Sequence, residues 1–515
     1  MSNNSTKKWG MFIFAVVWLS LFGGGVLFYT KYWKPRSERI AAEQAAKEKE
    51  DIFAATSSKK RYKHEPKFNY DLFSGYAPLR SNTFLEIAGS YDIGPEYKDD
   101  GADSTERLQD LASGKANMSV FTIGALQKAL YNHGDLPVTI VDIIDETKGA
   151  DAMIGSKLIF KNLDALNDPN LRIVCMKDTP SETLARVVMS QFKLTKVSES
   201  NFDFVDSPEA VFEAWKNTSL NEKAVFIMWE PYVSRALQNE NYRSIIDTSK
   251  FRGYIVDVVV ANREYLVKNE QVVLNYVKSY RETLFKRRND MEKLVMDDAS
   301  KIGDPLTPEQ AEQLVKGIWW KNTQEVYGHF GFTSGHGLQH IEEMIRNITD
   351  VLVKTGAIPK DPTNGQPNLI YYDGIIKRLH ESNWHPGFGH EQIRREKTLL
   401  ALTDTEWDSL IPVGTWKIEN LTFRRGTSSL SRRSYGKLND LAEKLNTWPQ
   451  YYLIVEGKAT KNGDVEANKQ IASDRAQSAV DYLISKGIDK NRIRARVGQL
   501  GNSTSVEFIL GEQSY

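Results

Sequence analysis

The feature that most constrains the fold is a long alternation of apolar strand-like runs and helical patterns through the middle of the chain. TFLEIAG is followed by LQDLASG, KANMSVFTIGALQKAL and LPVTIVDII, and later by LRIVCM, KAVFIMWEPYVSRAL and YIVDVVVAN. Such alternation is typical of βαβ units, in which helices cover a mostly parallel sheet. The pattern predicts a large α/β domain over residues 68–380.

Four segments of this region, in this order, resemble a known family. They are DLASGKANMSVFTIGAL, DETKGADAMIG, AVFIMWEPYVSRAL and DVVVANREYLVKNEQVV. Together they are similar to the type-II periplasmic binding proteins of the nitrate, sulfonate and thiamine-precursor branch. The resemblance implies a two-lobed fold that closes around a small-molecule solute, and a membrane permease or sensor as partner.

Two short motifs are candidates for the wall of such a cleft. Thr179-Pro-Ser-Glu182 reads as a capping box with Pro at the first helical position, so Thr179 is expected to cap and Glu182 to reach back. A helix start at a cleft offers N–H groups to an anion, which makes Thr179 and Ser181 ligand candidates; alternatively, the motif is only a well-made helix start. Trp229-Glu230-Pro matches the family's Trp-Asp/Glu-Pro cleft element, and hinge packing is its alternative role.

Further ligand candidates follow the predicted strands, where open α/β sheets bind their ligands. They are Thr122, Asp145, Thr147 and Asp151. With Glu146 and Glu230 they would form an acidic cleft that has no evident Arg partner. Like-charge repulsion in such a cleft disfavours nitrate or sulfonate and favours an amine or a zwitterion. The alternative is that several of these acids face solvent.

The C-terminal region carries a second pattern. GKATKNGDVEANKQIASDRAQSAVDYL, residues 457–483, reads as a strand end, a polar loop and an amphipathic helix. The preceding LTFRRGTSSLSRRSYGKLNDLAEKLNTWPQYYLIVEG predicts a strand, a helix and a second strand. The later helix is expected to bury Ala472, Ala476, Ala479, Val480 and Leu483, to end at Gly487, and to be followed by strands near 493–497 and 505–510.

These residues resemble the OmpA-like peptidoglycan-associating domain, an α/β sandwich, over residues 412–515. Gly457, Asn468 and Arg475 match the family motif, whereas the family's Asp falls on Thr460. The resemblance implies that Arg475 grips a carboxylate of diaminopimelate in the wall peptide, with Thr460 and Asn468 beside it. Thr460 can hydrogen-bond an ammonium group but cannot neutralise it, so a domain kept for its shape is the alternative.

The N-terminus predicts a membrane anchor. Residues 10–29 contain no charged side chain and are long enough to cross ~30 Å of hydrocarbon. We expect a cytoplasmic tail (1–9), an uncleaved transmembrane helix (10–30), a charged helical stalk (31–67) and, later, an interdomain linker (381–411). Lys and Arg residues after the span favour a cytoplasmic body, but an OmpA-like domain indicates a periplasmic body on the inner membrane. A proton-driven stator is not expected, because the span has no acid.

Composition excludes several functions. Lys plus Arg (67) equals Asp plus Glu (67), so no global charge attracts nucleic acid. Cys175 is the only cysteine, which excludes an intrachain disulfide and the Cys-rich motif of the thiamine-pyrimidine synthases. His336 and His340 have helical i, i+4 spacing, but Gly337 stands where a zinc protease needs Glu. We expect no enzyme, no cofactor and no metal site.

The sequence therefore predicts an inner-membrane solute receptor for transport or sensing, with a periplasmic body and an OmpA-like domain that reaches peptidoglycan. The alternative is a structural envelope linker with a vestigial cleft. A cleft with convergent polar groups favours the receptor, and a filled one favours the linker.

Overall fold

The structure is a computed structural model that describes residues 44, 47, 61–334, 337–387, 391–394, 399–501 and 505–513. The predicted cytoplasmic tail, the transmembrane helix (10–30) and most of the stalk lie outside the described residues, as does His336. In the described part, no helix combines the length and the apolar character needed to cross a membrane.

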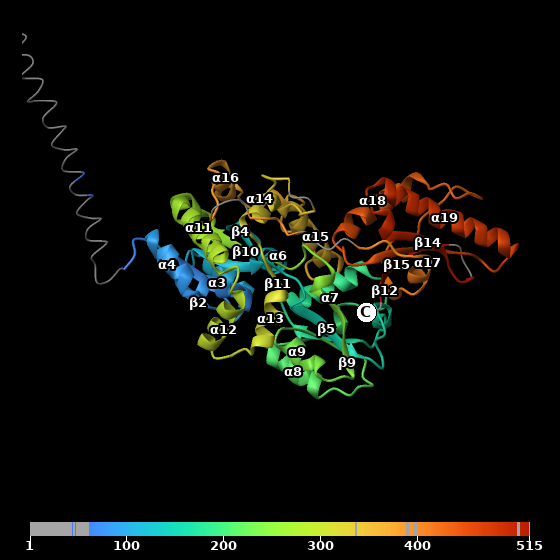
Figure 1. The fold of residues 1–515 in the computed structure, drawn as a ribbon, viewed down its shortest axis with the longest axis horizontal. Helices are drawn as coiled ribbons and strands as arrows, with labels where there is room; N and C mark the ends of the chain where they lie inside the picture. The colour runs from blue at the N-terminus through green and yellow to red at the C-terminus, as the bar shows by residue number, and fades with distance from the viewer. Residues whose placement is uncertain are drawn as a thin grey trace, which may run out of the picture. The chain divides into compact units, whose positions relative to one another are not determined.

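The chain divides into two compact units, residues 1–65 with 92–94 and residues 66–91 with 95–515. Within the first unit, the described residues form an isolated parallel bridge between His64 and Ile93. All named strands and helices below belong to the second unit (Figure 1).

The first lobe is built on a six-stranded sheet in the order β11-β4-β10-β3-β1-β2. Its strands are β1 (Lys67–Tyr70), β2 (Glu96–Asp99), β3 (Met118–Thr122), β4 (Val138–Thr147), β10 (Val256–Asn262) and β11 (Ile318–Trp320). β1 pairs in parallel with β2 and β3, whereas β10 is antiparallel to both β3 and β4. The sheet is thus mixed, not mostly parallel as predicted, because β10 re-enters it from the second lobe.

The second lobe is a five-stranded sheet in the order β7-β6-β8-β5-β9. Its strands are β5 (Asp151–Ser156), β6 (Arg172–Met176), β7 (Phe202–Val205), β8 (Ala224–Trp229) and β9 (Tyr242–Asp247). The chain enters this lobe from β4 into β5 and leaves it from β9 into β10. These two crossings form the junction between the lobes, which we call the hinge. Several of the predicted ligand-binding residues lie there.

Helices cover both sheets. The first lobe carries α3 (Ala77–Arg80), α4 (Asn82–Ser90), α5 (Ser104–Ala112), α6 (Ile123–His133), α10 (Arg263–Lys268), α11 (Glu270–Arg287), α12 (Met291–Ile302), α13 (Pro308–Lys316), α14 (Thr323–His329), α15 (Ile341–Lys354) and α16 (Gly374–Glu381). The second lobe carries α7 (Pro180–Gln191), α8 (Pro208–Lys216) and α9 (Tyr232–Leu237). Short 3-10 turns include η2 (Ser74–Tyr76) and η3 (Leu163–Leu166). In Figure 1, α11 lies beside α4, and α15 packs against both α6 and α7.

Apolar burial explains this arrangement. In the second lobe, alternate strand residues such as Ile154, Val174 and Phe226 are fully buried against Val211 and Trp215 of α8. Alternation with period two places these strand residues on one face of the sheet, which is the face that a helix must cover.

The C-terminal domain is a four-stranded sheet in the order β12-β15-β13-β14. It contains β12 (Ile411–Thr415), β13 (Tyr452–Lys458), β14 (Ile493–Val497), β15 (Ser505–Glu512), α17 (Asp404–Asp408), α18 (Arg432–Asn446) and α19 (Val465–Ser485). The buried residues of α19 are the predicted Ala472, Ala476, Ala479, Val480 and Leu483. The first strand, however, is β12, and the predicted strand after Leu421 is reduced to one bridge between Phe423 and Leu430.

Backbone and aromatic contacts join the second lobe to the C-terminal domain inside the larger unit. Phe192, which follows α7, forms an antiparallel bridge with Trp416, and Lys417 N–H donates to the Gln191 carbonyl at 2.7 Å. Trp448 is completely buried, and its ring lies 5.3 Å from the Phe192 ring and 5.1 Å from the Phe251 ring. Aromatic contacts and backbone hydrogen bonds of this kind stabilise the contact between the second lobe and the C-terminal domain.

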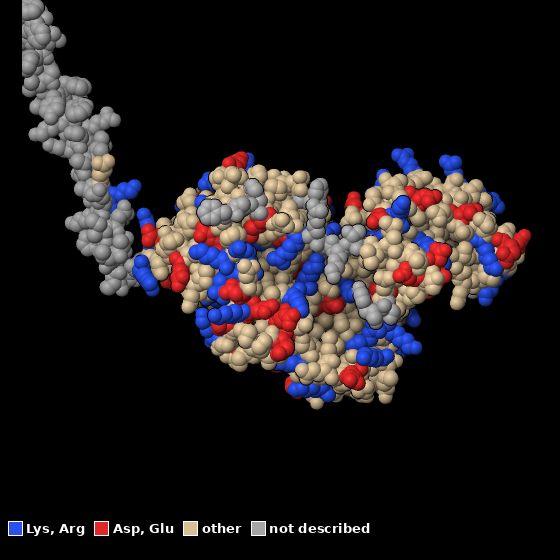
Figure 2. Space-filling model, in the orientation of Figure 1, with Lys and Arg blue, Asp and Glu red and all other residues tan. Residues whose placement is uncertain are grey.

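Acidic and basic side chains are interspersed over the face of the molecule drawn in Figure 2, in keeping with equal numbers of each in the sequence. Among the buried charges, acids with strongly raised pKa values lie at the hinge.

Candidate functional site

The hinge brings a row of polar side chains together across four strands of the first sheet. Asp257 of β10 is paired in register with Thr122 of β3 on one side and with Asp145 of β4 on the other. Asp145 is in turn paired with Trp320 of β11. Directly paired residues project from the same face of a sheet, so the two aspartates lie side by side.

Asp145 and Asp257 form a buried carboxyl pair. Asp145 is 0% exposed, and neither of its oxygens accepts a hydrogen bond from any described residue. Tyr76 O–H donates to Asp257 Oδ1 at 2.6 Å. Burial, together with the charge of Asp257, holds the pKa of Asp145 well above its usual range, and burial also raises the pKa of Asp257. A proton on Asp145 lets it donate to Asp257, so the pair is stable with one proton between its carboxyls.

Asp151 and Glu230 supply acids from the second lobe. Asp151 is 2% exposed, with Oδ1 unbonded among the described residues, and it is paired in register with Trp229 of β8. Burial, then the charges of Asp257 and Glu230, raise the pKa of Asp151 to about 8. Glu230 is half-buried and accepts hydrogen bonds from the Ser234 N–H and O–H. Burial also raises its pKa.

Two hydroxyl groups face the same cluster. Thr147 lies two residues beyond Asp145 on β4, hence on the same face, and its buried hydroxyl has no hydrogen-bond partner in the described structure. Tyr280 of α11 also has a buried, unbonded hydroxyl, and its pKa is raised by burial and then by the charge of Asp145. We call Asp145, Thr147, Asp151, Glu230, Asp257 and Tyr280 the hinge cluster.

The cations nearest the hinge cluster are already engaged. Lys321 Nζ lies 2.6 Å from Glu146 Oε2, and Arg107 pairs with Asp71 and Asp100. Arg235 lies 3.9 Å from Asp304. Within the described chain, none of the four acids of the hinge cluster forms an ion pair, and no three His, Cys, Asp or Glu residues are arranged to hold a metal ion. The cluster therefore carries uncompensated acid.

The motif at Thr179 begins a helix as predicted, but its capping bonds differ. The Thr179 hydroxyl donates to the Met176 carbonyl at 2.8 Å and makes no cap bond. Glu182 accepts from Lys128 Nζ at 2.9 Å, from Arg186 Nε at 2.6 Å and from the Asp178 N–H. The predicted capping box is therefore wrong at Thr179, whose hydroxyl bonds to the Met176 carbonyl instead of the helix N–H groups. Glu182 does reach back to the helix start, through the Asp178 N–H at 2.6 Å, and two buried cations share its carboxylate.

Thr179 and Ser181 lie at the start of α7, which meets the start of α6 beside Thr122, and Thr122 is itself paired in register with Asp257. Thr122 caps α6 through the Ala125 N–H at 3.2 Å. A Cβ added at Gly124 would lie 3.4 Å from Thr183 Oγ1 of α7, so the two helix starts meet. Ser181 is fully buried, with no bonded partner for its hydroxyl among the described residues.

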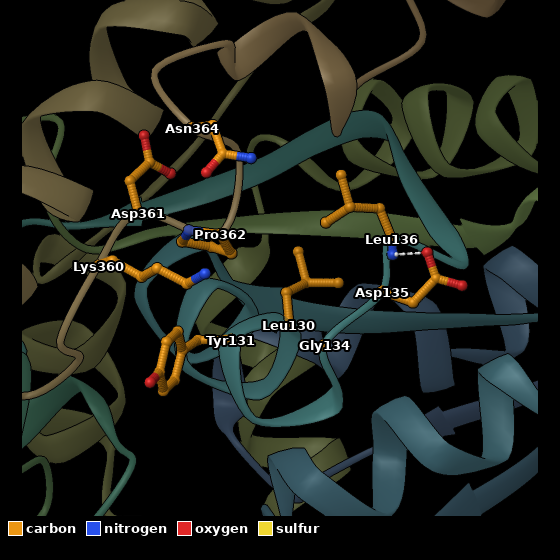
Figure 3. Close-up of a pocket in the computed structure, with 9 residues that line it drawn as sticks. All are labelled: Leu130, Tyr131, Gly134, Asp135, Leu136, Lys360, Asp361, Pro362 and Asn364. Atoms are coloured by element: carbon orange, nitrogen blue, oxygen red, sulfur yellow. Dashed lines mark hydrogen bonds between the residues drawn. The ribbon is translucent and has the colours of Figure 1, made fainter.

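A small hollow lies at the opposite end of α6. It encloses about 150 Å³ and is lined by Leu130, Tyr131, Gly134, Asp135, Leu136, Lys360, Asp361, Pro362 and Asn364 (Figure 3). Since α6 has 11 residues, this hollow is ~16 Å along the helix from Thr122. None of the residues predicted from the sequence lines it, and the three aspartates of the hinge cluster are at most 2% exposed.

The wall-facing candidates lie on the C-terminal domain. Asn468 Nδ2 donates to the carbonyls of Thr460 (3.3 Å) and Asn462 (2.8 Å), which ties the loop to the start of α19. Arg475 is two turns further on, its guanidinium 4.9 Å from the Phe423 ring centroid and its Nε bonded to the Thr427 carbonyl at 3.2 Å. Arg475 makes no ion pair within the described chain, so its remaining N–H groups are available to a carboxylate.

Sequence reasoning missed Asp257, Tyr76 and Tyr280, and it misjudged Glu146. Asp257 and Asp145 are 112 positions apart, and only strand register joins them. A usable signal was a single acid inside an apolar strand, as in IVDVVVA, because such an acid must be buried. Glu146 belongs to the other face of β4, where Lys321 neutralises it.

The strand order and the α18–β13–α19 arrangement define the C-terminal region as an OmpA-like domain, and comparison confirms it. The OmpA family model matches residues 422–506. The peptidoglycan-associated lipoprotein of Mesorhizobium japonicum is 33% identical over 76 residues, which is 15% of this chain and 45% of that protein. The corresponding lipoprotein of Rhizobium meliloti is 29% identical over 94 residues, 18% of this chain and 51% of its own length. The chain thus matches about half the length of these curated relatives.

Solved structures similar to the two-lobed region are periplasmic binding proteins. The periplasmic aliphatic sulphonate binding protein SsuA from Escherichia coli is 14% identical, with a TM-score of 0.45, and covers 61% of this chain and 99% of its own. The nitrate-binding protein NrtA from Synechocystis is 7% identical, with a TM-score of 0.45, and covers 62% and 88%. The strand orders and the double crossing, rather than these values, carry the two-lobed assignment.

Proposed function

We propose that this protein is a solute receptor of the cell envelope, which captures a small ligand at the hinge and is tethered to peptidoglycan through Arg475. An N-terminal anchor in the inner membrane would place the receptor beside a permease or a sensor. Tethering raises the effective concentration of a receptor near such a partner without any new contact. Catalysis forms no part of this function.

The hinge cluster is the observation that supports the proposal. Four acids converge where two lobes meet, three of them buried and none ion-paired in the described chain. Burying unpaired acids costs stability, and perturbed acids concentrate at functional sites. A purely structural hinge gains nothing from this cost, whereas a receptor needs polar groups that a ligand will satisfy.

The second candidate is a structural link between membrane and wall. It is favoured by the burial of the hinge-cluster aspartates and by the backbone bridge between Phe192 and Trp416. In that case the buried acids would no longer bind a ligand, and no solute would stabilise the protein.

Thermal unfolding of the full-length protein with a panel of amines, amino acids, sulfonates, nitrate and vitamin precursors separates these functions. A ligand at ~100 times its dissociation constant adds roughly 2.7 kcal/mol to the free energy of unfolding. The receptor predicts a rise in Tm with at least one compound that is lost in Asp151→Asn. No rise with any compound, in a protein that melts cooperatively, supports the linker.

The wall tether makes its own prediction. Arg475→Ala should release the protein from sedimented peptidoglycan, because the carboxylate loses its bidentate partner, whereas Arg496→Ala, at an exposed position of β14, should not. Thr460→Asp should tighten binding to diaminopimelate-containing wall by ~10-fold, since it adds an anion for the ammonium group. Unchanged sedimentation of both Arg475→Ala and Thr460→Asp would show that this domain has another partner.

A further inference from the structure

The two lobes present matching chemistry to each other at the hinge. Asp145 of the first lobe has Trp320 as its directly paired cross-strand neighbour, and Asp151 of the second lobe has Trp229. Side chains paired in this way have Cβ atoms ~5 Å apart on one face. Each lobe therefore offers a carboxyl group next to an indole ring.

More aromatic surface surrounds the Asp145 carboxyl. A Cβ added at Gly75 would lie 2.8 Å from Asp145 Oδ2 and 2.3 Å from the Phe73 ring, so that ring and that oxygen flank the same point. Trp320 Nε1 donates to the Gly75 carbonyl at 2.8 Å, which fixes the indole in place. Carboxyl groups set among aromatic faces are the surroundings that recognise an organic cation.

The unbonded hydroxyl groups point to a ligand independently of the acids. Tyr280 and Thr147 are each more than nine-tenths buried, belong to different elements, and have no hydrogen-bond partner in the described structure. Buried hydroxyl groups are almost always bonded in a folded protein. A polar ligand at the hinge cluster would supply the missing partners.

We propose that the hinge cluster binds a small aliphatic ammonium compound, held between the carboxyl groups and the aromatic rings of the two lobes. This inference rests on the proposed receptor function and names its substrate class. An oxyanion is disfavoured, because it would meet Asp145, Asp257, Asp151 and Glu230 without a free cation among the described neighbours.

Protonation of the cluster makes the proposal measurable. Asp151 is faced by Asp257 and Glu230, and Asp257 by Tyr76, Asp145, Asp71 and Arg107. The charge of Lys321 acts on Asp145, and the charge of Arg235 acts on Glu230. With the pKa of Asp151 near 8, the empty site holds a proton at pH 6 that a bound cation must expel. Affinity for a cation should therefore rise ~10-fold per pH unit up to about pH 8 and level off above it.

Choline is the sharpest probe, since its quaternary charge does not change with pH. Calorimetric titration of the full-length protein with choline, putrescine, ethanolamine, sulfate, nitrate and magnesium, at pH 6 and pH 8.5, measures both class and linkage. At least one ammonium compound should bind, ~100-fold more tightly at pH 8.5, with proton release seen as a buffer-dependent heat. Asp151→Asn should abolish binding, and it should fold, because it removes a buried acid. Asp297→Asn, an exposed acid on α12, is the matched control.

The outcomes distinguish an error in the ligand class from an error in the receptor function. Binding of sulfate or nitrate but of no ammonium compound, or ammonium binding with no dependence on pH and no effect of Asp151→Asn, overturns the inference and leaves a receptor for another solute. Magnesium binding alone also overturns it. Failure of these probes, together with failure of the wider solute panel in a cooperatively folded protein, overturns the receptor function itself.

Discussion

The two faces of strand β4 each bury an acid, and only one of these two acids has a cationic partner. Glu146, on one face, has Lys321 Nζ at 2.6 Å, and this pairing lowers the pKa of Glu146 against the effect of burial. Asp145, on the other face, has no ion pair within the described chain, and its pKa is raised. Both side chains are at most 3% exposed, so burial does not account for the difference.

This difference separates structure from function within one strand. A buried charge with a dedicated partner belongs to the fold, because the pair satisfies itself. A buried acid without a partner is not neutralised by any other group of the fold. At the junction of two lobes, a bound cationic ligand can neutralise it. Three substitutions test this division, one of a paired charge and two of unpaired acids.

Lys321→Met should have the largest effect. It leaves Glu146 buried without its cation, and breaking a buried pair in this way costs about 3–5 kcal/mol of unfolding free energy. Urea denaturation of the variant measures the loss. Lys316→Met, which removes an exposed partner of Glu312, is the control and should be near neutral. A loss no larger than that of the control would mean that the Glu146 face is no better paired than the Asp145 face.

Local sequence patterns were sufficient to predict those features of the fold that depend on residues close together in the sequence. The buried positions of α19 follow from its own periodicity, and the α/β alternation gave two lobes of the right class. Thr179 shows where such patterns fail, because its hydroxyl bonds to the Met176 carbonyl instead of capping the helix. The bond from Lys128, 54 positions earlier, to Glu182 was likewise not visible in the local motif. Asp257 joins the hinge cluster through strand register alone, and a single sequence does not reveal register between distant strands.

Asp151→Asn should have an intermediate effect that depends on pH. The folded pKa of about 8 exceeds the unfolded value of 3.8, so the folded state binds the extra proton. Stability from this group is fully present below pH 3.8 and is lost as pH rises through 8. The variant should therefore match the native protein near pH 4 and exceed it above pH 8, by on the order of a few kcal/mol. Urea midpoints at pH 4.5, 7 and 9 measure this gap, with Asp297→Asn as reference, and a gap that stays constant would show that Asp151 ionises normally.

Asp145→Asn should have the smallest effect on stability and a complete one on binding. Burial and the charge of Asp257 hold the pKa of Asp145 well above its usual range, so the protonated carboxyl is favoured, and the amide of Asn can donate to Asp257 as that carboxyl would. The free energy of unfolding should then change by less than about 1 kcal/mol. A stabilisation above ~2 kcal/mol would instead show that Asp145 is ionised beside Asp257 in the folded protein. Asn cannot share the negative charge of the Asp145–Asp257 pair, however, so ammonium binding should be lost although the fold is unchanged. If Asp145 serves the ligand and not the fold, its substitution must abolish binding and leave the free energy of unfolding unchanged.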